Sequence, residues 1–162
     1  MKIVITNAVP ADLDDIAALE AVCFPPAEAA EKESFKKRID RFPESFFTAK
    51  ADGKIIGVIN GCVTNSNVFY DAMYHDDKEH VENGKNQTVF GLLVHPDYQK
   101  KGIAEALLNH MINVSRERGK QAVILTCKDK LIHYYEKFGF VNKGVSDSGH
   151  GGAVWYNMYL KL

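Results

Sequence analysis

The run "GLLVHPDYQKKGIAEALLNHMI", Gly91 to Ile112, constrains the fold more than any other stretch of the chain. An apolar segment stops at a proline, a polar loop follows, and Ile103, Leu107 and Met111 then recur at helical spacing. A strand therefore passes into a helix through a short turn that contains Gly102. Because a helix N-terminus carries unpaired amides and a partial positive charge, and because glycine allows close backbone approach, this turn is suited to hold an anion.

The glycine pattern of this turn excludes two common phosphate-binding motifs. The chain contains no G-x-x-x-x-G-K-[ST] sequence, and the G-x-G-x-x-G spacing is missing as well. The remaining pattern, Q-x-x-G-x-A, also describes an ordinary loop capped by glycine. The turn alone therefore leaves the nature of the anion open.

Length and charge narrow the class of protein. With 162 residues the chain is predicted to form a single domain, residues 1–162. A net charge of -1 argues against a nucleic-acid partner, and no apolar stretch reaches the roughly 20 residues that span a bilayer. The three cysteines have no metal-binding spacing and are expected to be free thiols in a reducing compartment, which predicts a cytoplasmic protein without a metal.

Periodicity predicts alternating strands and helices. Two apolar runs flank Asp52-Gly53, a strong signal for a hairpin with a type I′ turn. Residues 65–86 are polar and long for a connection, so they form either a binding loop or a floppy insertion. The run from Val89 to Val94 is expected to be one central strand. The full predicted order is β-α-α-β-β-β-α-β-α-β-β, an α/β or α+β domain with a mixed sheet.

A second motif follows about 30 residues after the turn. "CKDKLIHYYEKFGF" places Tyr134 and Tyr135 on a short helix that ends in Phe138-Gly139-Phe140. Together with "VHPDYQKKGIAEALL", this motif resembles the GNAT superfamily of acetyl-CoA-dependent N-acetyltransferases. The turn matches the R/Q-x-x-G-x-G/A motif of that family, and Tyr135 holds the place of its tyrosine three residues before F-G-F. The resemblance implies one domain with a mixed, mostly antiparallel central sheet of about six to seven strands and flanking helices.

The resemblance also implies how the cosubstrate binds. Backbone amides of the turn would hold the pyrophosphate of acetyl-CoA, and the edge of the preceding strand would pair with the pantetheine arm. The residues expected to bind acetyl-CoA are Leu92, Leu93, Val94, Gln99, Lys100, Lys101, Gly102, Ile103 and Ala104. Two lysines in a loop are more often merely solvated, so their contribution stays open.

The expected reaction is direct attack of a primary amine on the thioester within a ternary complex. By resemblance, Tyr135 is the general acid that protonates the CoA thiolate, an effect worth roughly 10² to 10⁴ in rate where it operates. The alternative for Tyr135 is aromatic packing between helix and sheet, a role that suits Tyr134 better. No metal takes part in this scheme.

The general base is not set by the resemblance. "CFPPAEAA", "ESFKKRI" and "FPESFFTAKADGKIIGVING" are similar to the arylalkylamine N-acetyltransferase-like branch, but Thr88 and Phe90 stand where its vertebrate enzymes carry two histidines. Glu28 is the preferred candidate, although a carboxylate near a helix start can serve the helix dipole alone. Proton loss to solvent is a further alternative, and the remaining candidate bases are His95, His133 and His150.

The acceptor is predicted to be a small, possibly arylalkyl, primary amine. Carboxylates and aromatic rings are available to surround such a cation: Glu28, Asp71, Asp76, Asp77, Phe24, Phe69, Tyr70 and Tyr74. A protein or peptide N-acetyltransferase is the alternative, and it would show an open groove between residues 24–42 and 65–86. A non-catalytic acetyl-CoA-binding module is a third reading. The protein is expected to be a monomer or a homodimer, and the role of residues 146–153 is left open.

Overall fold

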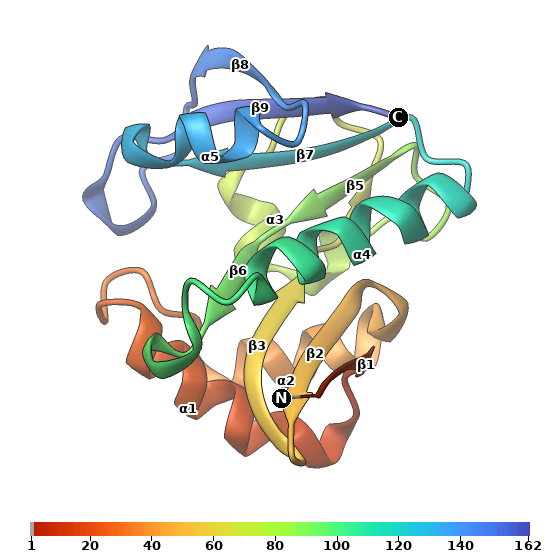
Figure 1. The fold of residues 1–162 in the computed structure, drawn as a ribbon. Helices are drawn as coiled ribbons and strands as arrows, with labels where there is room; N and C mark the ends of the chain where they lie inside the picture. Colours follow the sequence, from red (N-terminus) through yellow and green to blue (C-terminus); the bar gives the residue numbers. More distant parts are fainter. Residues whose placement is uncertain (1) are drawn as a thin grey trace.

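The computed structural model describes residues 2–162, which fold into two sheets flanked by helices (Figure 1). The first sheet is antiparallel and has the strand order β1-β2-β3-β6. Its strands are β1 (Ile3–Asn7), β2 (Phe46–Ala51), β3 (Lys54–Asn60) and β6 (Gly91–Val94). The second sheet has the order β4-β5-β7-β9-β8, and within it β5 and β7 run parallel. Its strands are β4 (Val63–Thr64), β5 (Asn86–Val89), β7 (Ala122–Cys127), β8 (Val141–Val145) and β9 (Tyr156–Lys161). The predicted mixed, mostly antiparallel α/β architecture is confirmed.

The helices are α1 (Leu13–Cys23), α2 (Lys32–Arg41), α3 (Asp71–His75), α4 (Ile103–Glu117) and α5 (Ile132–Glu136). Helices α1 and α4 lie on opposite sides of the first sheet, and α5 packs on the second sheet (Figure 1). In α4, Leu107, Leu108 and Met111 are fully buried and belong to a core that includes residues of both sheets. A second core lies between the first sheet and α1 and α2, where Ile16 and Phe35 are buried. The long helix α4 therefore ties the two sheets together (Figure 1).

The hairpin between β2 and β3 forms as predicted. Asp52 has φ 51° and Gly53 has φ 80°, so both central residues adopt the left-handed conformation that a type I′ turn requires. Lys54 and Ala51 pair directly on either side of the turn.

The prediction of one strand from Val89 to Val94 is wrong. The run is divided at Phe90 into β5, which pairs with β7, and β6, which pairs with β3. The amide of Phe90 donates to the carbonyl oxygen of Asn60 at 2.8 Å. The backbone amide at the point where the chain changes sheets is therefore still hydrogen-bonded. Gly61 permits the crossing, because a Cβ there would lie 2.0 Å from the carbonyl oxygen of Thr88. The two sheets diverge beyond this point.

Residues 65–86 are not a featureless insertion. They contain α3 and a turn of 3-10 helix at Asp77–Glu79, and Met73 is buried against Phe42 and Cys62. Of the two alternatives that the sequence left open for this segment, the floppy insertion does not agree with this packing.

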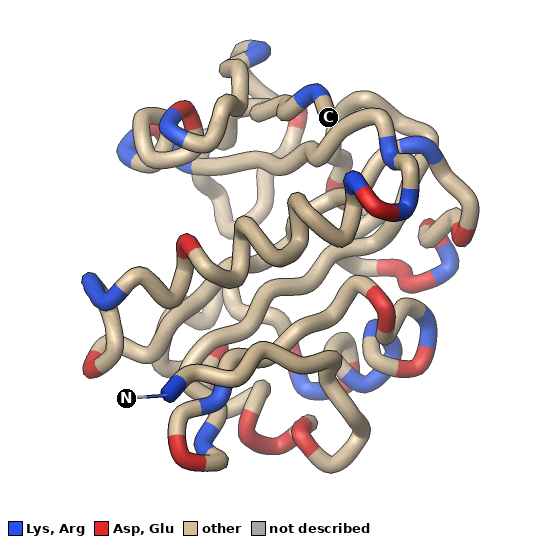
Figure 2. Tube along the Cα trace, turned by 45° about the vertical axis from the view of Figure 1, so that its right-hand side comes forward, with Lys and Arg blue, Asp and Glu red and all other residues tan. Residues whose placement is uncertain are grey.

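Charge is spread over loops and helix ends. Figure 2 shows Lys, Arg, Asp and Glu interspersed there, with the central strands almost free of charge. None of the helices in residues 2–162 is both long and apolar enough to cross a lipid bilayer.

Candidate functional site

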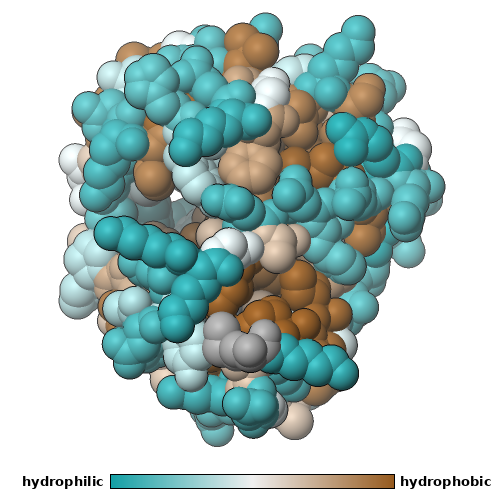
Figure 3. Space-filling model, viewed as in Figure 1, coloured by the Kyte–Doolittle hydropathy of each residue, from teal (hydrophilic) through white to brown (hydrophobic). Residues whose placement is uncertain are grey.

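A cavity of about 530 Å³ lies where the two sheets diverge. One wall is β6 with Leu92, Leu93 and Val94, and the opposite wall is the end of β7 with Cys127, beside Tyr135 of α5. Figure 3 shows the surface hollowed at the left of the view, between the half with α5 and the half with α1. Because β6 is the last strand of its sheet, its outer edge faces the cavity with no neighbouring strand in the described part of the chain. Such an edge presents amides and carbonyls that an extended ligand can pair with.

The turn after β6 has the conformation of an anion-binding helix start. Gly102 is the N-cap of α4 with φ 80° and ψ 8°, and Lys100 also has a positive φ of 61°. The first bond of the helix runs from the Ala106 amide to the Gly102 carbonyl at 3.0 Å. The amides of Ile103 and Ala104 therefore lack partners within the helix. The side chain of Ile103 is buried in the core, so only its backbone is available to a ligand.

Gln99 connects the turn to the cavity. Its side-chain amide donates to the carbonyl oxygen of Val94 at 3.1 Å, and the residue lines the cavity. Lys100 and Lys101 are exposed at the tip of the turn. The turn thus places backbone donors and positive charge next to the opening between the sheets.

Tyr135 and Tyr134 occupy different environments. Tyr135 lines the cavity although it is only 8% exposed, and its ring packs against Phe140 with centroids 5.7 Å apart. Burial raises the pKa of Tyr135, and the neighbouring Cys127 adds to that effect. The hydroxyl of Tyr134 is buried and has no hydrogen-bond partner among the described residues. Of these two tyrosines, Tyr135 lines the cavity and Tyr134 does not.

Glu28 lies in the cavity wall and is held by several contacts. Its Oε2 accepts a hydrogen bond from Lys128 Nζ at 2.9 Å, and its side chain is 11% exposed. Its main-chain carbonyl accepts from the Tyr74 hydroxyl at 3.1 Å and from His150 Nε2 at 2.9 Å. One carboxylate oxygen of Glu28 is thus engaged by Lys128, and the described residues make no hydrogen bond to the other.

Three segments close the cavity on the side away from the turn, and we call them the roof: residues 24–30, 65–86 and 146–153. The hydroxyl of Ser148 donates to Asp71, and the amide of Gly149 lies 3.3 Å from Asp71 Oδ2. The indole of Trp155 donates to the carbonyl of His150 at 2.8 Å. Residues 24–42 and 65–86 are also joined, through the bonds of Tyr74 to Glu28 and Arg38.

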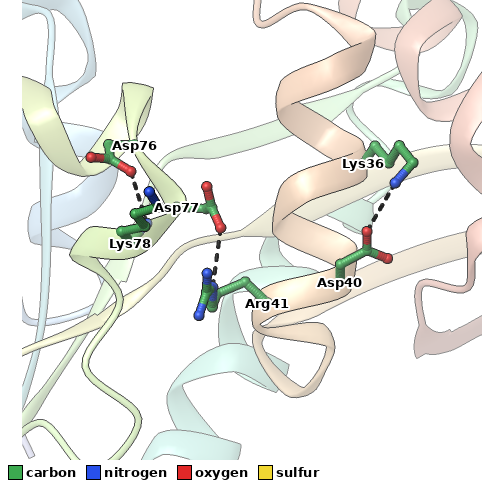
Figure 4. Close-up of polar contacts among 6 residues, drawn as sticks. All are labelled: Lys36, Asp40, Arg41, Asp76, Asp77 and Lys78. Carbon is green, nitrogen blue, oxygen red and sulfur yellow. Dashed lines mark hydrogen bonds and ion pairs between the residues drawn. The ribbon is translucent and has the colours of Figure 1, made fainter.

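Most of the other predicted site residues lie elsewhere. Neither His95 nor His133 lines the cavity, and the side chain of His133 is 96% exposed beside Glu136. Asp77 pairs with Arg41 at 3.1 Å, outside the cavity (Figure 4). Asp71 and Asp76 serve backbone and loop contacts, and Tyr70 also lies outside the cavity. Of the predicted aromatic residues, the cavity contains Phe24, Phe69 and Tyr74, and Phe90 joins them there.

Four charged residues of the cavity were not predicted, and two of them, Glu20 and Arg38, are deeply buried, each only 4% exposed; the other two are Lys128 and Lys130. Glu20 Oε2 accepts from the Ala30 amide at 3.0 Å. Burial raises the pKa of Glu20, and the Ala30 hydrogen bond and the charge of Arg38 oppose that rise. A spacing signal existed, because Glu20 is four residues after buried Ile16 and Arg38 is three residues after buried Phe35.

Arg38 is held at the inner end of the cavity. Its Nη1 donates to Asn60 Oδ1 at 3.1 Å, and its Nη2 donates to the Tyr74 carbonyl at 2.9 Å. The guanidinium lies 4.5 Å from the ring centroid of Tyr74 and 4.8 Å from that of Phe90. Burial lowers the pKa of Arg38, while Tyr74 and Glu20 act in the opposite direction. Within the described residues, no carboxylate forms an ion pair with this cation.

The thiols match their prediction as free cysteines. Cys62 and Cys127 are buried and Cys23 is half-buried. Burial raises the pKa of each thiol to about 11, so all three are weakly reactive. Residues 2–162 contain no group of three or more His, Cys, Asp or Glu side chains arranged to hold a metal ion.

Comparison with known sequences identifies a family. The model of the family described as "Acetyltransferase (GNAT) family" matches residues 13–140. "Probable hydrolase YhcX" of Bacillus subtilis is 27% identical over 141 residues, which are 83% of this chain and 28% of that protein. "Uncharacterized N-acetyltransferase ycf52" of Porphyra purpurea is 28% identical over 75 residues, 46% of this chain and 41% of that protein. The chain thus covers less than half the length of either relative.

Solved structures share the fold at low sequence identity. The loading GNATL domain of CurA from Lyngbya majuscula aligns with a TM-score of 0.87 at 15% identity, over 99% of this chain and 98% of that one. The GphF GNAT-like decarboxylase in complex with isobutyryl-CoA aligns with a TM-score of 0.84 at 19% identity, over 98% of each chain. These likenesses support the predicted architecture.

Proposed function

Because the chain belongs to the GNAT acetyltransferase family, we propose that it transfers the acetyl group of acetyl-CoA to a primary amine. The observation that carries the proposal is that the free edge of β6 and Tyr135 line one cavity, and that Gln99, which also lines it, leads directly into the N-terminus of α4. Each of these features can bind or act on one part of an acyl-CoA: the pantetheine arm, the diphosphate or the thioester sulfur.

The turn and the strand edge would bind the cosubstrate. Amides from Lys100 to Ala104 would hold the diphosphate, with the helix dipole and the two lysines adding attraction. Backbone groups from Leu92 to Val94 would pair with the amides of the pantetheine arm. Gln99, which joins the turn to β6, would fix the angle between these two parts of the ligand. The same fold holds isobutyryl-CoA in the GphF decarboxylase, which supports an acyl-CoA at this site.

In the proposed reaction, the neutral amine nitrogen attacks the thioester carbon. The carbon–sulfur bond breaks, and the CoA sulfur leaves with the electron pair. Tyr135 donates its proton to that sulfur, which gives the free thiol of CoA. The amide product forms when the nitrogen loses a proton to a carboxylate or to water, and Tyr135 regains a proton from solvent.

Two carboxylates of the cavity are candidates for the proton acceptor. Glu28 keeps one oxygen free of Lys128, and Glu20 is more deeply buried. Burial raises the pKa of Glu20, so its carboxylate, once ionised, binds a proton more strongly than an ordinary carboxylate. We keep Glu28 as the proposed base and add Glu20 as the alternative that the structure supplies. The histidine pair of the vertebrate arylalkylamine enzymes has no equivalent, since Thr88 is buried and donates to the Cys62 carbonyl at 2.8 Å.

The closed roof supports a small acceptor over a protein or peptide. The Tyr74 hydroxyl donates to the Glu28 carbonyl and the Tyr74 carbonyl accepts from Arg38, so residues 24–42 and 65–86 are in contact where a peptide acceptor would need a groove. The aromatic walls suit an arylalkyl body, in line with the predicted branch.

The test is release of CoA thiol from acetyl-CoA against a panel of arylalkylamines, polyamines, aminoglycosides and short peptides. Parent protein, Tyr135→Phe and the matched control Tyr134→Phe are compared. Turnover of one small-amine class that Tyr135→Phe reduces and Tyr134→Phe does not would support the proposal. Acetyl-CoA binding without turnover of any amine would leave a non-catalytic acetyl-CoA-binding module, and preferred turnover of peptides would overturn the small acceptor.

A further inference from the structure

We propose that the acceptor amine also carries a carboxylate, and that Arg38 binds it. The acceptor class is then an amino acid, or a related amino carboxylate, with an apolar or aromatic body. This inference deepens the proposed transfer reaction and rests on it. It differs from the predicted arylalkylamine, which has a positive charge and no negative one.

The first argument is that Arg38 is a buried cation without an acidic contact. It lines the cavity at 4% exposure, and its two described hydrogen bonds go to neutral oxygens of Asn60 and Tyr74. A guanidinium has five N–H donors, so several remain for a ligand. Glu20 acts on this cation through space and not through a direct hydrogen bond. Burying a charge without a directly paired anion is costly, which makes an anion in the cavity favourable.

The second argument is the shape of the guanidinium and its surroundings. The planar fork of an arginine matches the two oxygens of a carboxylate. Tyr74 and Phe90 hold the group in place, with its carbon 4.5 and 4.8 Å from their ring centroids. Aromatic rings exclude water from this end of the cavity, so an ion pair formed there is screened little.

The third argument is the balance of charge among the cavity residues. Lys128 is already paired with Glu28 at 2.9 Å, so Arg38 is the more deeply buried and less compensated cation. Glu20, also 4% exposed in the same cavity, provides negative charge for an ammonium group. A molecule with one amine and one carboxylate offers each of these two residues a group of opposite charge, whereas a phosphate dianion would have a single arginine to bind it.

A structural role for Arg38 is the rival explanation, since it links α2 to the roof through the Tyr74 carbonyl. Arg41 provides a matched control. It lies on the same helix and also bonds the 65–86 segment, through Asp77 at 3.1 Å, but it lies outside the cavity (Figure 4). Loss of a helix-to-roof contact can therefore be separated from loss of a ligand contact.

The experiment compares matched ligands on matched variants. L-phenylalanine, its amide and phenethylamine are measured as acceptors with acetyl-CoA, and their binding is measured by calorimetry in the presence of CoA. The proteins are the parent, Arg38→Gln, Arg38→Lys and Arg41→Gln. We expect the parent to favour L-phenylalanine over its amide and phenethylamine by about tenfold or more in both readouts, as for other charge-assisted contacts. Arg38→Gln should abolish that preference, Arg38→Lys should retain part of it, and Arg41→Gln should leave it intact.

Several outcomes would overturn the inference. One is that the parent protein acetylates and binds the three ligands equally well. This result does not depend on whether any variant folds. Another is an equal loss for all three ligands in Arg38→Gln. A parent preference for malonyl-CoA over acetyl-CoA that Arg38→Gln removes would place the carboxylate on the acyl group, and a preference for glucosamine 6-phosphate would replace it by a phosphate. Absence of turnover with selective L-phenylalanine binding would instead contradict the transfer reaction and leave the carboxylate site standing.

Discussion

Glu28 and Lys128 stand 100 residues apart in the chain, and their side chains meet at 2.9 Å across the edge of the cavity. The contact joins the segment after α1 to the end of β7, which belong to opposite sides of the gap between the sheets. The side chain of Glu28 is 11% exposed and that of Lys128 is 31% exposed. This ion pair is therefore partly shielded from solvent, and it links the roof to the second sheet.

Lys128→Met should destabilise the fold. Removal of the ammonium leaves a largely buried carboxylate without its counter-charge, and we expect a loss of about 1–3 kcal/mol, below the range for fully buried pairs. Urea unfolding of the parent, Lys128→Met, Glu28→Gln and the double variant measures it. A coupling energy near zero in that cycle would show that the pair contributes nothing to stability.

Tyr135→Phe should lower kcat by about 10² to 10⁴ and leave the KM for acetyl-CoA almost unchanged. The hydroxyl acts on the leaving sulfur only in the transition state. Because burial raises the pKa of Tyr135, the group stays protonated at neutral and moderately alkaline pH, so kcat of the parent should show no alkaline decline up to about pH 9. Steady-state kinetics across pH check both points, and Tyr134→Phe should keep near-parental kcat. An alkaline decline that disappears in Tyr135→Phe would contradict the raised pKa.

Gly102→Ala should weaken acetyl-CoA binding more than it weakens the fold. The residue has φ 80°, a conformation that costs an alanine about 1–2 kcal/mol, and its relaxation would shift the amides of the turn. Gly119 at the other end of α4 has φ 73° and is the matched control. In neither glycine would an added Cβ meet a protein atom within 4 Å. Both alanine variants should lose a similar free energy of unfolding. Only Gly102→Ala should raise the acetyl-CoA dissociation constant, by about tenfold, which corresponds to about 1.4 kcal/mol of binding free energy.

Stability should depend on pH through Glu20. Burial raises its pKa above the usual 4.5, so the folded protein holds this proton more tightly than the unfolded chain. The tighter proton binding of Glu20 in the folded state stabilises the fold. This stabilisation is fully present below about pH 4.5, and it is lost as pH rises through the raised pKa of Glu20 in the folded protein. Glu20→Gln, which carries no charge, should therefore gain stability relative to the parent as pH increases from about 4 to 8.

Urea unfolding at several pH values measures this difference. Glu33→Gln, a change at an exposed position of α2, is the control and should follow the parent at each pH. Curves for Glu20→Gln and the parent that stay parallel over the whole range would mean that Glu20 titrates normally in the folded protein.

Local signals in the sequence determined most of the architecture. The Asp52-Gly53 turn, the start of α4 at Gly102 and its end before Gly119 all depend on backbone conformations that few residues tolerate. The division at Phe90 gave no such signal. A run of apolar residues has the same sequence pattern whether it pairs with one sheet or is divided between two. The division depends on which strands lie beside the run, and these come from distant parts of the chain.

Site residues that belong to one continuous sequence motif could be predicted, and those brought together from several segments could not. Tyr135 and the turn belong to local motifs, and both border the same cavity opening. Glu20 and Arg38 come from two helices, and their burial follows from tertiary packing that places a charged residue on an otherwise apolar face. Both positions have the helical spacing of buried residues. A charged residue at such a position was therefore the only sequence feature that could have indicated a site.

The roof has a consequence for the order in which the molecule folds. Its contacts join residues separated by 46, 100 and 122 positions, through Tyr74, Lys128 and His150, all of which meet Glu28. Contacts between such distant positions form late, because the intervening chain must first be ordered. We therefore expect the sheets and α4 to assemble before the roof closes, and the roof to open in local fluctuations that leave the core intact. A cavity covered in this way can exchange its contents without unfolding the protein that surrounds it.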